Sequence, residues 1–172
     1  MTNDTADRAA MLRARLIRNV EEVPKTAERR DPLYDSIGAR LAAGTAALKL
    51  GASVDIVPPG KRSCPYHFHH TQEEMFVVLE GQGSLRVAGE MLPISTGDVM
   101  FIPPGPDYPH QIINTSDAPL KYLSISTRER PEIVEYPDSN KYQAIGGPDA
   151  GGTDFRRVHR AADDLDYWAG EP

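Results

Sequence analysis

Short apolar stretches rich in Val, Ile, Leu, Phe and Tyr recur from Leu41 to Thr127, and clusters of Gly, Pro, Asn or Asp close each of them. Such stretches are typical of β-strands separated by turns. Because no strong helical pattern lies between them, the chain favours an antiparallel sandwich or barrel over alternating strands and helices. The predicted fold class is therefore all-β. The expected strands are residues 47–57, 64–70, 74–79, 84–87, 98–102, 110–113 and 120–126.

The segments on either side of residues 41–128 differ from this pattern. Residues 1–40 are charged, with apolar residues at helical spacing, although residues 15–19 could equally form an edge strand. Residues 129–172 combine proline, glycine and acidic clusters with aromatic side chains, which favours an arm that wraps around the barrel over a second domain. The sequence predicts an N-terminal extension, a barrel and a C-terminal wrapping tail.

Composition narrows the class of partners. With 172 residues, 40% of them hydrophobic and 26% charged, the chain has the size and make-up of one globular domain. A net charge of -6 disfavours nucleic acid and anionic membranes, since both need basic patches. No apolar run could span a bilayer, and the start from Met1 to Asp4 lacks the layout of a secretory signal, so we expect a cytoplasmic protein. The single cysteine, Cys64, excludes an internal disulfide and fits a reducing compartment.

The residues that carry chemistry surround a His-x-His pair in the second expected strand. Alternate side chains of a strand point to the same face, so His67 and His69 should both project to one side. After a turn at residues 70–72 the chain should return antiparallel, with either Glu73 or Glu74 on the side of the histidines. Two imidazoles and one carboxylate could then meet one ion, and alternation alone leaves the choice of glutamate open.

Residues 60–81 resemble the first conserved motif of the cupin superfamily: a glycine, His-x-His, a Glu three or four residues on, and a glycine after six more. Counting back from the closing glycine selects Glu74. Residues 97–105, followed by His110 and Asn114, are similar to the second cupin motif. One departure is the loop before His110, which has four residues where the usual pattern has two.

This resemblance implies a double-stranded β-helix, or jelly-roll, barrel that holds one divalent metal ion through His67, His69, Glu74 and His110. Three neutral imidazoles and one carboxylate suit Fe(II), Mn(II), Ni(II), Co(II) or Zn(II). Four protein ligands in an octahedral site leave two positions for water, substrate or dioxygen. Alternatively, the histidines are barrel residues satisfied by hydrogen bonds, as in cupins that have lost metal. Such proteins usually lose a ligand, whereas this chain keeps all four.

Other residues have a structural explanation beside a functional one. Cys64 falls on the strand face opposite the His-x-His pair if the pairing is regular, which favours a structural thiol over a ligand. We expect His70 at an exposed turn and His159 exposed in the tail. Three cations in the expected strands, Lys49, Arg86 and Lys121, could bind an anionic substrate if they point inward, although such residues more often face water. Four apolar residues could line the cavity or belong to the core. They are Phe76, Val78, Ile112 and Tyr122.

Within the superfamily, the chain most resembles small single-domain proteins of the conserved-barrel (cupin type 2) kind, which are often labelled sugar-phosphate-isomerase-like. This resemblance rests on the two motifs and on residues 134–139 after the last expected strand. The fold hosts isomerases, oxygenases, decarboxylases, lyases and non-catalytic binders, so the barrel alone does not define the reaction. We predict no organic cofactor and a small-molecule ligand. Because the barrel has sheet edges that need covering, to which the N-terminal zone could supply a strand, we also expect a homodimer.

The leading hypothesis is a metal-dependent enzyme that acts on a small polar metabolite, of the oxygenase or isomerase type, with the ion as Lewis acid. Isomerisation also needs a general base, and no second inward-facing carboxylate or histidine is evident. That tilts the prediction toward a dioxygenase, and no catalytic residue is assigned. The alternative is a non-catalytic binding or sensing protein in which the metal only fixes the ligand.

Overall fold

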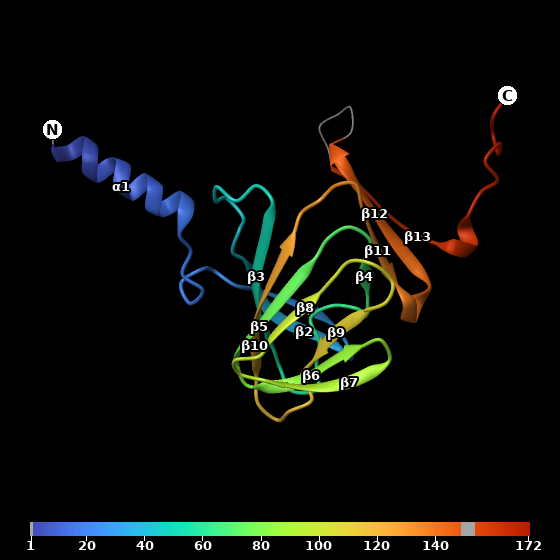
Figure 1. Ribbon diagram of the computed structural model, residues 1–172, viewed down its shortest axis with the longest axis horizontal. Coiled ribbons are helices and arrows are strands. Elements are labelled where there is room, and N and C mark those ends of the chain that lie inside the picture. The colour runs from blue at the N-terminus through green and yellow to red at the C-terminus, as the bar shows by residue number, and fades with distance from the viewer. Residues whose placement is uncertain (1, 149–153) are drawn as a thin grey trace.

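The computed structural model describes residues 2–148 and 154–172, which are almost entirely β-structure after one N-terminal helix (Figure 1). The all-β prediction is confirmed. In this part of the chain, no helix has the length and apolar character needed to cross a bilayer. The elements are α1 (Thr2–Leu16), β1 (Thr26–Arg30), β2 (Tyr34–Arg40), β3 (Leu50–Val57), β4 (Phe68–His69), β5 (Glu74–Glu80), β6 (Gln82–Val87), β7 (Glu90–Ser95), β8 (Val99–Ile102), β9 (His110–Ile113), β10 (Leu120–Thr127), β11 (Glu132–Tyr136), β12 (Lys141–Pro148) and β13 (Asp154–Arg160), with 3₁₀ turns at Pro137–Ser139 and Ala161–Asp163.

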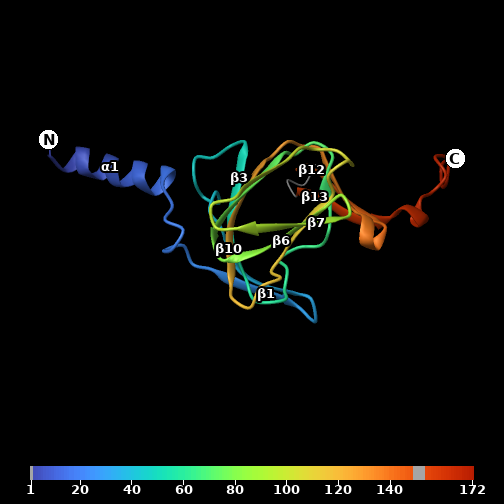
Figure 2. The same cartoon turned by 60° about the horizontal axis from the view of Figure 1, so that its bottom comes forward.

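The strands form a jelly-roll barrel of antiparallel sheets. One sheet has six strands in the order β1-β2-β3-β10-β5-β8, a second has the order β13-β12-β11-β4, and a third has the order β7-β6-β9. Figure 1 shows β4 and β11 side by side at one end of the barrel, and both views show α1 and the last residues projecting from opposite sides (Figures 1 and 2). Strands adjacent in a sheet are therefore often far apart in the sequence.

The core of the barrel is formed by the side chains that alternate toward the interior along each strand. Along β5, Glu74, Phe76 and Val78 are buried, whereas the residues between them are less so. Phe76 and Val78 pack against residues from β3, β6, β7, β8, β9 and β10 in one cluster. The core members are Val57, Phe76, Val78, Leu85, Ile94, Met100, Ile102, Ile112, Leu120 and Tyr122. The inward face of β5 is apolar except at its first residue, Glu74.

Several elements differ from the expected ones. The helical alternative for the N-terminal zone holds in α1, but residues 26–40 form β1 and β2, which pair with each other and with β3. Residues 90–95 form β7, where no strand was expected. Beyond residue 128, β11 pairs with both β4 and β12. Strands thus extend past both limits expected for the barrel.

Candidate metal centre and its cavity

Three imidazole nitrogens converge on one carboxylate oxygen. The Nε2 atoms of His67, His69 and His110 lie 3.8, 3.4 and 2.8 Å from Oε2 of Glu74. The potential ligand atoms of His67, His69 and Glu74 all lie within 4.8 Å of one another. The rings of His67 and His110 have centroids 4.6 Å apart. The structure brings together all four residues that the sequence singled out.

Backbone pairing sets this arrangement. His69 ends β4, Glu74 begins β5, and His110 begins β9. The backbone N–H groups of His67 and His110 each donate to the carbonyl of the other, at 3.1 and 2.8 Å. This bridge fixes the register of His110 whatever the length of the loop before it. Glu73 is exposed while Glu74 is buried, which resolves the choice between the two carboxylates.

The ring nitrogens that face away from the cluster determine which nitrogens are free to ligate. Nδ1 of His67 lies 2.8 Å from the carbonyl of Pro65, and Nδ1 of His110 lies 3.3 Å from that of Tyr108. A carbonyl only accepts, so Nδ1 of each ring is the donor in these contacts. Nε2 of each ring is then the nitrogen that faces Glu74 and is left to ligate, as in a metal-ligating histidine.

The cluster leaves buried polar atoms unpaired. Within residues 2–148 and 154–172, Oε2 of Glu74, Nε2 of His110 and Nδ1 of His69 are buried without a hydrogen-bond partner of acceptable geometry, even though the first two lie close together. Unsatisfied buried polar atoms are costly and rare. Two of these atoms lie where the three imidazoles converge. One divalent cation would satisfy both, so the residues present fit a metal ion.

The charge states also suit a cation. Burial raises the pKa of the Glu74 carboxyl, but the contacts with His110, His69 and His67 outweigh it and hold the pKa below its usual range. Burial lowers the pKa of His69, and this effect exceeds the opposing attraction of Glu74. Near neutral pH, Glu74 is therefore ionised and His69 neutral, the forms that bind metal.

Glu132 supports the segment that carries the candidate ligands, and nothing in the sequence pointed to this role. Its fully buried carboxylate on β11 accepts the backbone N–H groups of His70, Thr71 and Gln72 at 3.0–3.2 Å, and the Thr71 hydroxyl as well. Its Oε1 also lies 3.5 Å from Nδ1 of His69. Glu132 thus fixes the turn between His69 and Glu74. The pairing of β11 with β4, which places it there, has no local sequence signal.

Replacing Glu132 with alanine should weaken metal binding by about 10–100-fold, the usual cost of losing a partner that orients a ligand. Three N–H groups would lose their acceptor, and the turn between two ligands would loosen. Competition with a chelator in a metal titration measures the affinity, and a thermal melt of the metal-free protein separates it from stability. Glu135→Ala, on the same strand but with a side chain that is 46% exposed, is the control. Equal affinity in the two variants would rule out a positioning role for Glu132.

A cavity of about 230 Å³ opens beside the cluster and contains a second carboxylate. In the register of β3 against β10, Asp55 lies opposite Tyr122 and Ser53 opposite Ser124. Burial raises the pKa of Asp55, while a hydrogen bond from Ser53 opposes the shift. The lining residues are Ser53, Asp55, Ser63, Cys64, His67, Glu74, Phe76, Tyr122 and Ser124. The expectation that no second carboxylate faces inward was wrong.

Cys64 and Tyr122 line the same cavity in their protonated forms. Cys64 shares the cavity with His67, contrary to the expected alternation, because only Phe68–His69 of residues 64–70 is regular strand. Burial and the nearby Glu74 raise the pKa of its thiol to about 12. Burial also raises the pKa of Tyr122 well above its usual value, and its hydroxyl lies 2.5 Å from that of Ser63. A protonated thiol is a poor metal ligand, which is consistent with the structural role favoured for Cys64.

The strand cations do not point into the metal cavity. Arg86 forms two hydrogen bonds with Asp138, at 2.6 and 2.8 Å, and its guanidinium lies 3.8 Å from the centre of the Tyr66 ring. Lys121 pairs with Glu21, and Lys49 is exposed. None of the three lines the cavity beside the cluster.

The remaining predicted residues divide between the surface and the barrel. His70 and His159 are exposed as expected, and His70 lies 2.7 Å from Glu135. Phe76 and Tyr122 line the cavity as well as the core, whereas Val78 and Ile112 belong to the core alone. Asn114 is fully buried and donates to the carbonyls of Val57 and Ala118, at 2.7 and 2.8 Å. Its role is to fix the chain after β9.

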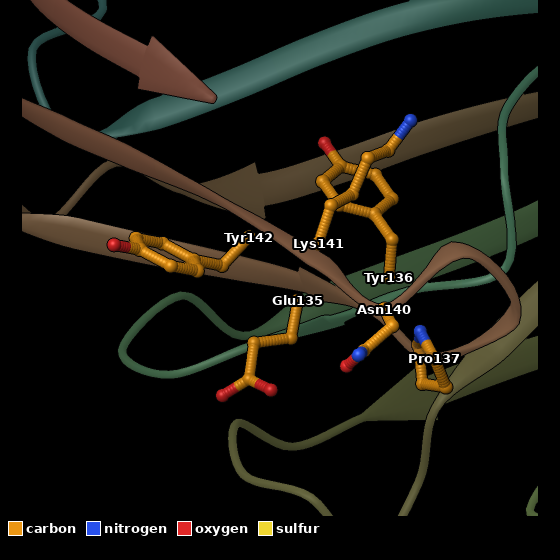
Figure 3. A pocket seen from close by; sticks show the side chains of 6 residues that line it. All are labelled: Glu135, Tyr136, Pro137, Asn140, Lys141 and Tyr142. Carbon is orange, nitrogen blue, oxygen red and sulfur yellow. The ribbon is translucent and has the colours of Figure 1, made fainter. Parts of the chain in front are cut away.

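A separate hollow at the β11–β12 turn is too small for a metabolite. Figure 3 shows Tyr136 and Lys141 on one side of this hairpin and Glu135 pointing the other way. The volume is about 60 Å³, and the ammonium group of Lys141 lies 5.1 Å from the Tyr136 ring centre. Tyr136 also stacks near His67, with ring centroids 6.1 Å apart. Its contribution to the metal centre is therefore packing.

Comparison with known proteins agrees with the geometry. The cupin domain family matches residues 53–126. An uncharacterized protein of Methanocaldococcus jannaschii is 38% identical over 84 residues, covering 46% of this chain and 65% of that protein. An oxalate-binding protein of Thermotoga maritima is 35% identical over 69 residues, covering 40% of this chain and 54% of that protein. Each match spans less than two thirds of the relative's own length.

Among solved structures, a candidate sugar phosphate isomerase from Acidithiobacillus ferrooxidans superposes with a TM-score of 0.75 and 25% identity. The match covers 90% of this chain and 97% of that one. It therefore includes strands beyond residues 53–126, on both sides of the matched family region.

Proposed function

Since this chain belongs to the cupin superfamily, we propose that it is a metal-dependent enzyme that acts on a small polar metabolite. One divalent ion, of Fe, Mn, Ni, Co or Zn, would be held by His67, His69, Glu74 and His110. The observation that carries the proposal is the convergence of three Nε2 atoms on a buried, unpaired carboxylate oxygen. No catalytic residue was assigned from the sequence. We now assign the role of catalytic base to Asp55.

The proposed reaction is an isomerisation in which Asp55 moves a proton. The bound ion would supply a Lewis acid that polarises a carbonyl oxygen of the substrate. Asp55 faces the same cavity as Glu74, and its pKa is raised by burial, toward the range suited to a general base near neutral pH. It would take the proton from the carbon beside the carbonyl and return it to the carbonyl carbon, while a hydroxyl proton passes to the former carbonyl oxygen. Substrate and product are isomers, and no oxidant is consumed.

The choice of isomerase over oxygenase rests on Asp55. The dioxygenase alternative was preferred only because a base was missing, and the cavity supplies one. The similar structure from Acidithiobacillus ferrooxidans, described as a candidate sugar phosphate isomerase, also supports an isomerase. The oxalate-binding relative instead favours a non-catalytic binding protein. This is the second candidate function.

Hydrogen exchange in D₂O tests the proposal before the natural substrate is known. Protein loaded with each of the five metals is incubated with a panel of aldoses, ketoses and their phosphates, and NMR follows deuterium entry beside the carbonyl. We expect metal-dependent exchange with at least one compound. Substrate-dependent oxygen consumption without exchange would support the oxygenase instead, and tight binding with neither would support the non-catalytic binder.

We further propose that the protein is a homodimer in which α1 packs on a second copy. Helix α1 projects away from the barrel in both views (Figures 1 and 2). Four apolar side chains along it and just after it are more than two-fifths exposed. Light scattering at micromolar concentration should give twice the mass of one chain, falling to a single mass in the double variant Leu12→Ser/Leu16→Ser. A monomeric wild-type protein would contradict this. The four residues are Met11, Leu12, Leu16 and Ile17.

A further inference from the structure

A second cavity, of about 400 Å³, adjoins the metal cavity and is lined by three arginines. We call it the arginine vestibule, after Arg40, Arg128 and Arg156. Ser53 and Ser124 line both cavities, so the two share a wall. The other lining residues of the vestibule are Ala42, Ala43, Gly51, Ala52 and Ser126.

The strand register shows how the vestibule is joined to the centre. Arg40 of β2 pairs with Ser53 of β3, Ser53 pairs with Ser124 of β10, and Ser124 pairs with Phe76 of β5. Residues directly opposite one another present their side chains on the same face of a sheet. The row from Phe76 to Arg40 therefore runs along one face and crosses three strand spacings, or about 14 Å.

A second row lies beside it and reaches the proposed ligand itself. Glu74 pairs with Ser126, and Ser126 pairs with Gly51. A side chain at residue 51 would place its Cβ 2.8 Å from the Ser126 hydroxyl and 3.7 Å from Cγ and Cδ of Arg128. The absence of a side chain at Gly51 thus leaves room for the side chain of Arg128 beside this residue. Small hydroxyl side chains form a polar track between the carboxylate of Glu74 and the guanidinium groups.

The vestibule is positive in an acidic protein. The chain has a net charge of -6, yet none of the described residues that line the vestibule is acidic. Within residues 2–148 and 154–172, none of the three arginines forms an ion pair, whereas Arg29 and Arg86 elsewhere do. All three side chains are exposed, so their mutual repulsion is screened by water, and their guanidinium groups are accessible to an anion from solution. Their planar arrays of N–H donors match the oxygens of a phosphate.

We propose that the arginine vestibule binds the phosphate group of a phosphorylated small metabolite whose carbonyl end enters the metal cavity. This inference rests on the proposed function and narrows its substrate class to phosphate esters. The serine track between the two cavities provides hydrogen-bonding groups for the hydroxyls of the intervening carbon chain.

Titration of the full-length, metal-free protein with inorganic phosphate tests the vestibule separately from the metal. Calorimetry at low ionic strength should show saturable binding that Arg40→Gln, Arg128→Gln and Arg156→Gln each weaken by about tenfold, the usual value of one charge-assisted hydrogen bond. Arg128→Lys, which keeps the charge but loses the planar donors, should fall between Arg128→Gln and the wild type. Arg8→Gln, on the exposed side of α1, should bind as the wild type does. Thermal melts show whether each variant is folded.

Phosphate binding that is absent, or equally affected by Arg8→Gln, would overturn the inference. So would equal affinity for acetate, because the vestibule would then not select a phosphate. The proposed function is judged by a different measurement, the metal-dependent exchange in D₂O. Exchange confined to unphosphorylated sugars would contradict the proposed phosphate site and support the isomerase activity. Arginine-dependent phosphate binding without any exchange would support the phosphate site and contradict the isomerase activity.

Discussion

Alanine at any one of His67, His69, Glu74 or His110 will lower the affinity for the divalent ion by at least about 100-fold. The expected loss exceeds the 10–100-fold that removing a supporting partner costs, because a coordinating atom itself is removed. Glu74→Ala should be the most severe, since its Oε2 is the atom on which the three Nε2 atoms converge. A competitive titration with a chelating dye on stripped protein gives each affinity.

Glu73→Ala is the matched control for this series. Glu73 precedes Glu74 in the chain but is exposed, so its removal should leave the metal affinity unchanged. Full affinity in His110→Ala would show that this residue is a buried barrel histidine and not a ligand. Normal melting of each metal-free variant would establish that the barrel survives the change, as expected for a fold with its own apolar core.

Asp55→Asn will keep the metal but lose about 10²–10⁴-fold in the rate of hydrogen exchange beside the substrate carbonyl, the usual contribution of a general base. The amide has the shape of the carboxylate and can still accept a hydrogen bond from Ser53, but it cannot take up a proton at this pH. NMR in D₂O measures the rate, and elemental analysis measures the metal.

Glu28→Gln controls for the loss of one negative charge near Asp55. Glu28 lies close enough to raise the pKa of Asp55, yet it is exposed and does not line the metal cavity. Its replacement should lower that pKa slightly and leave the exchange rate close to that of the wild type. If Asp55→Asn exchanged as fast as Glu28→Gln, Asp55 would not be the base, and the isomerase proposal would lose its support.

Part of the histidine and glutamate cluster could be predicted from the sequence because its geometry is local. His67 and His69 are two residues apart, so alternation places them on one face, while the choice of Glu74 over Glu73 came from the resemblance to cupins. His110 is far away in the chain and was reached only through the resemblance to cupins. The strands around these residues were predicted for the same reason, since apolar residues and turn residues mark them in the sequence.

The missing elements and residues depend on pairing between distant segments. Glu132 reaches His69 because β11 pairs with β4, and Asp55 faces the cavity because β3 pairs with β10. Neither pairing leaves a local pattern. Strand β7 has a different explanation: it lies at the edge of its sheet, is mostly exposed and contains Pro93, so it lacks the alternation that reveals a half-buried strand.

X-ray absorption at the metal edge, on full-length protein stripped and reconstituted with each of the five ions in turn, tests the metal centre most directly. We expect one tightly held ion per chain, surrounded by nitrogen and oxygen atoms at about 2.0–2.2 Å in the zinc form. Three of these ligands should show the scattering of imidazole rings, and two in His110→Ala. A protein that retains none of the five ions, or one whose ion has no imidazole neighbours, would show that these residues do not form a metal site.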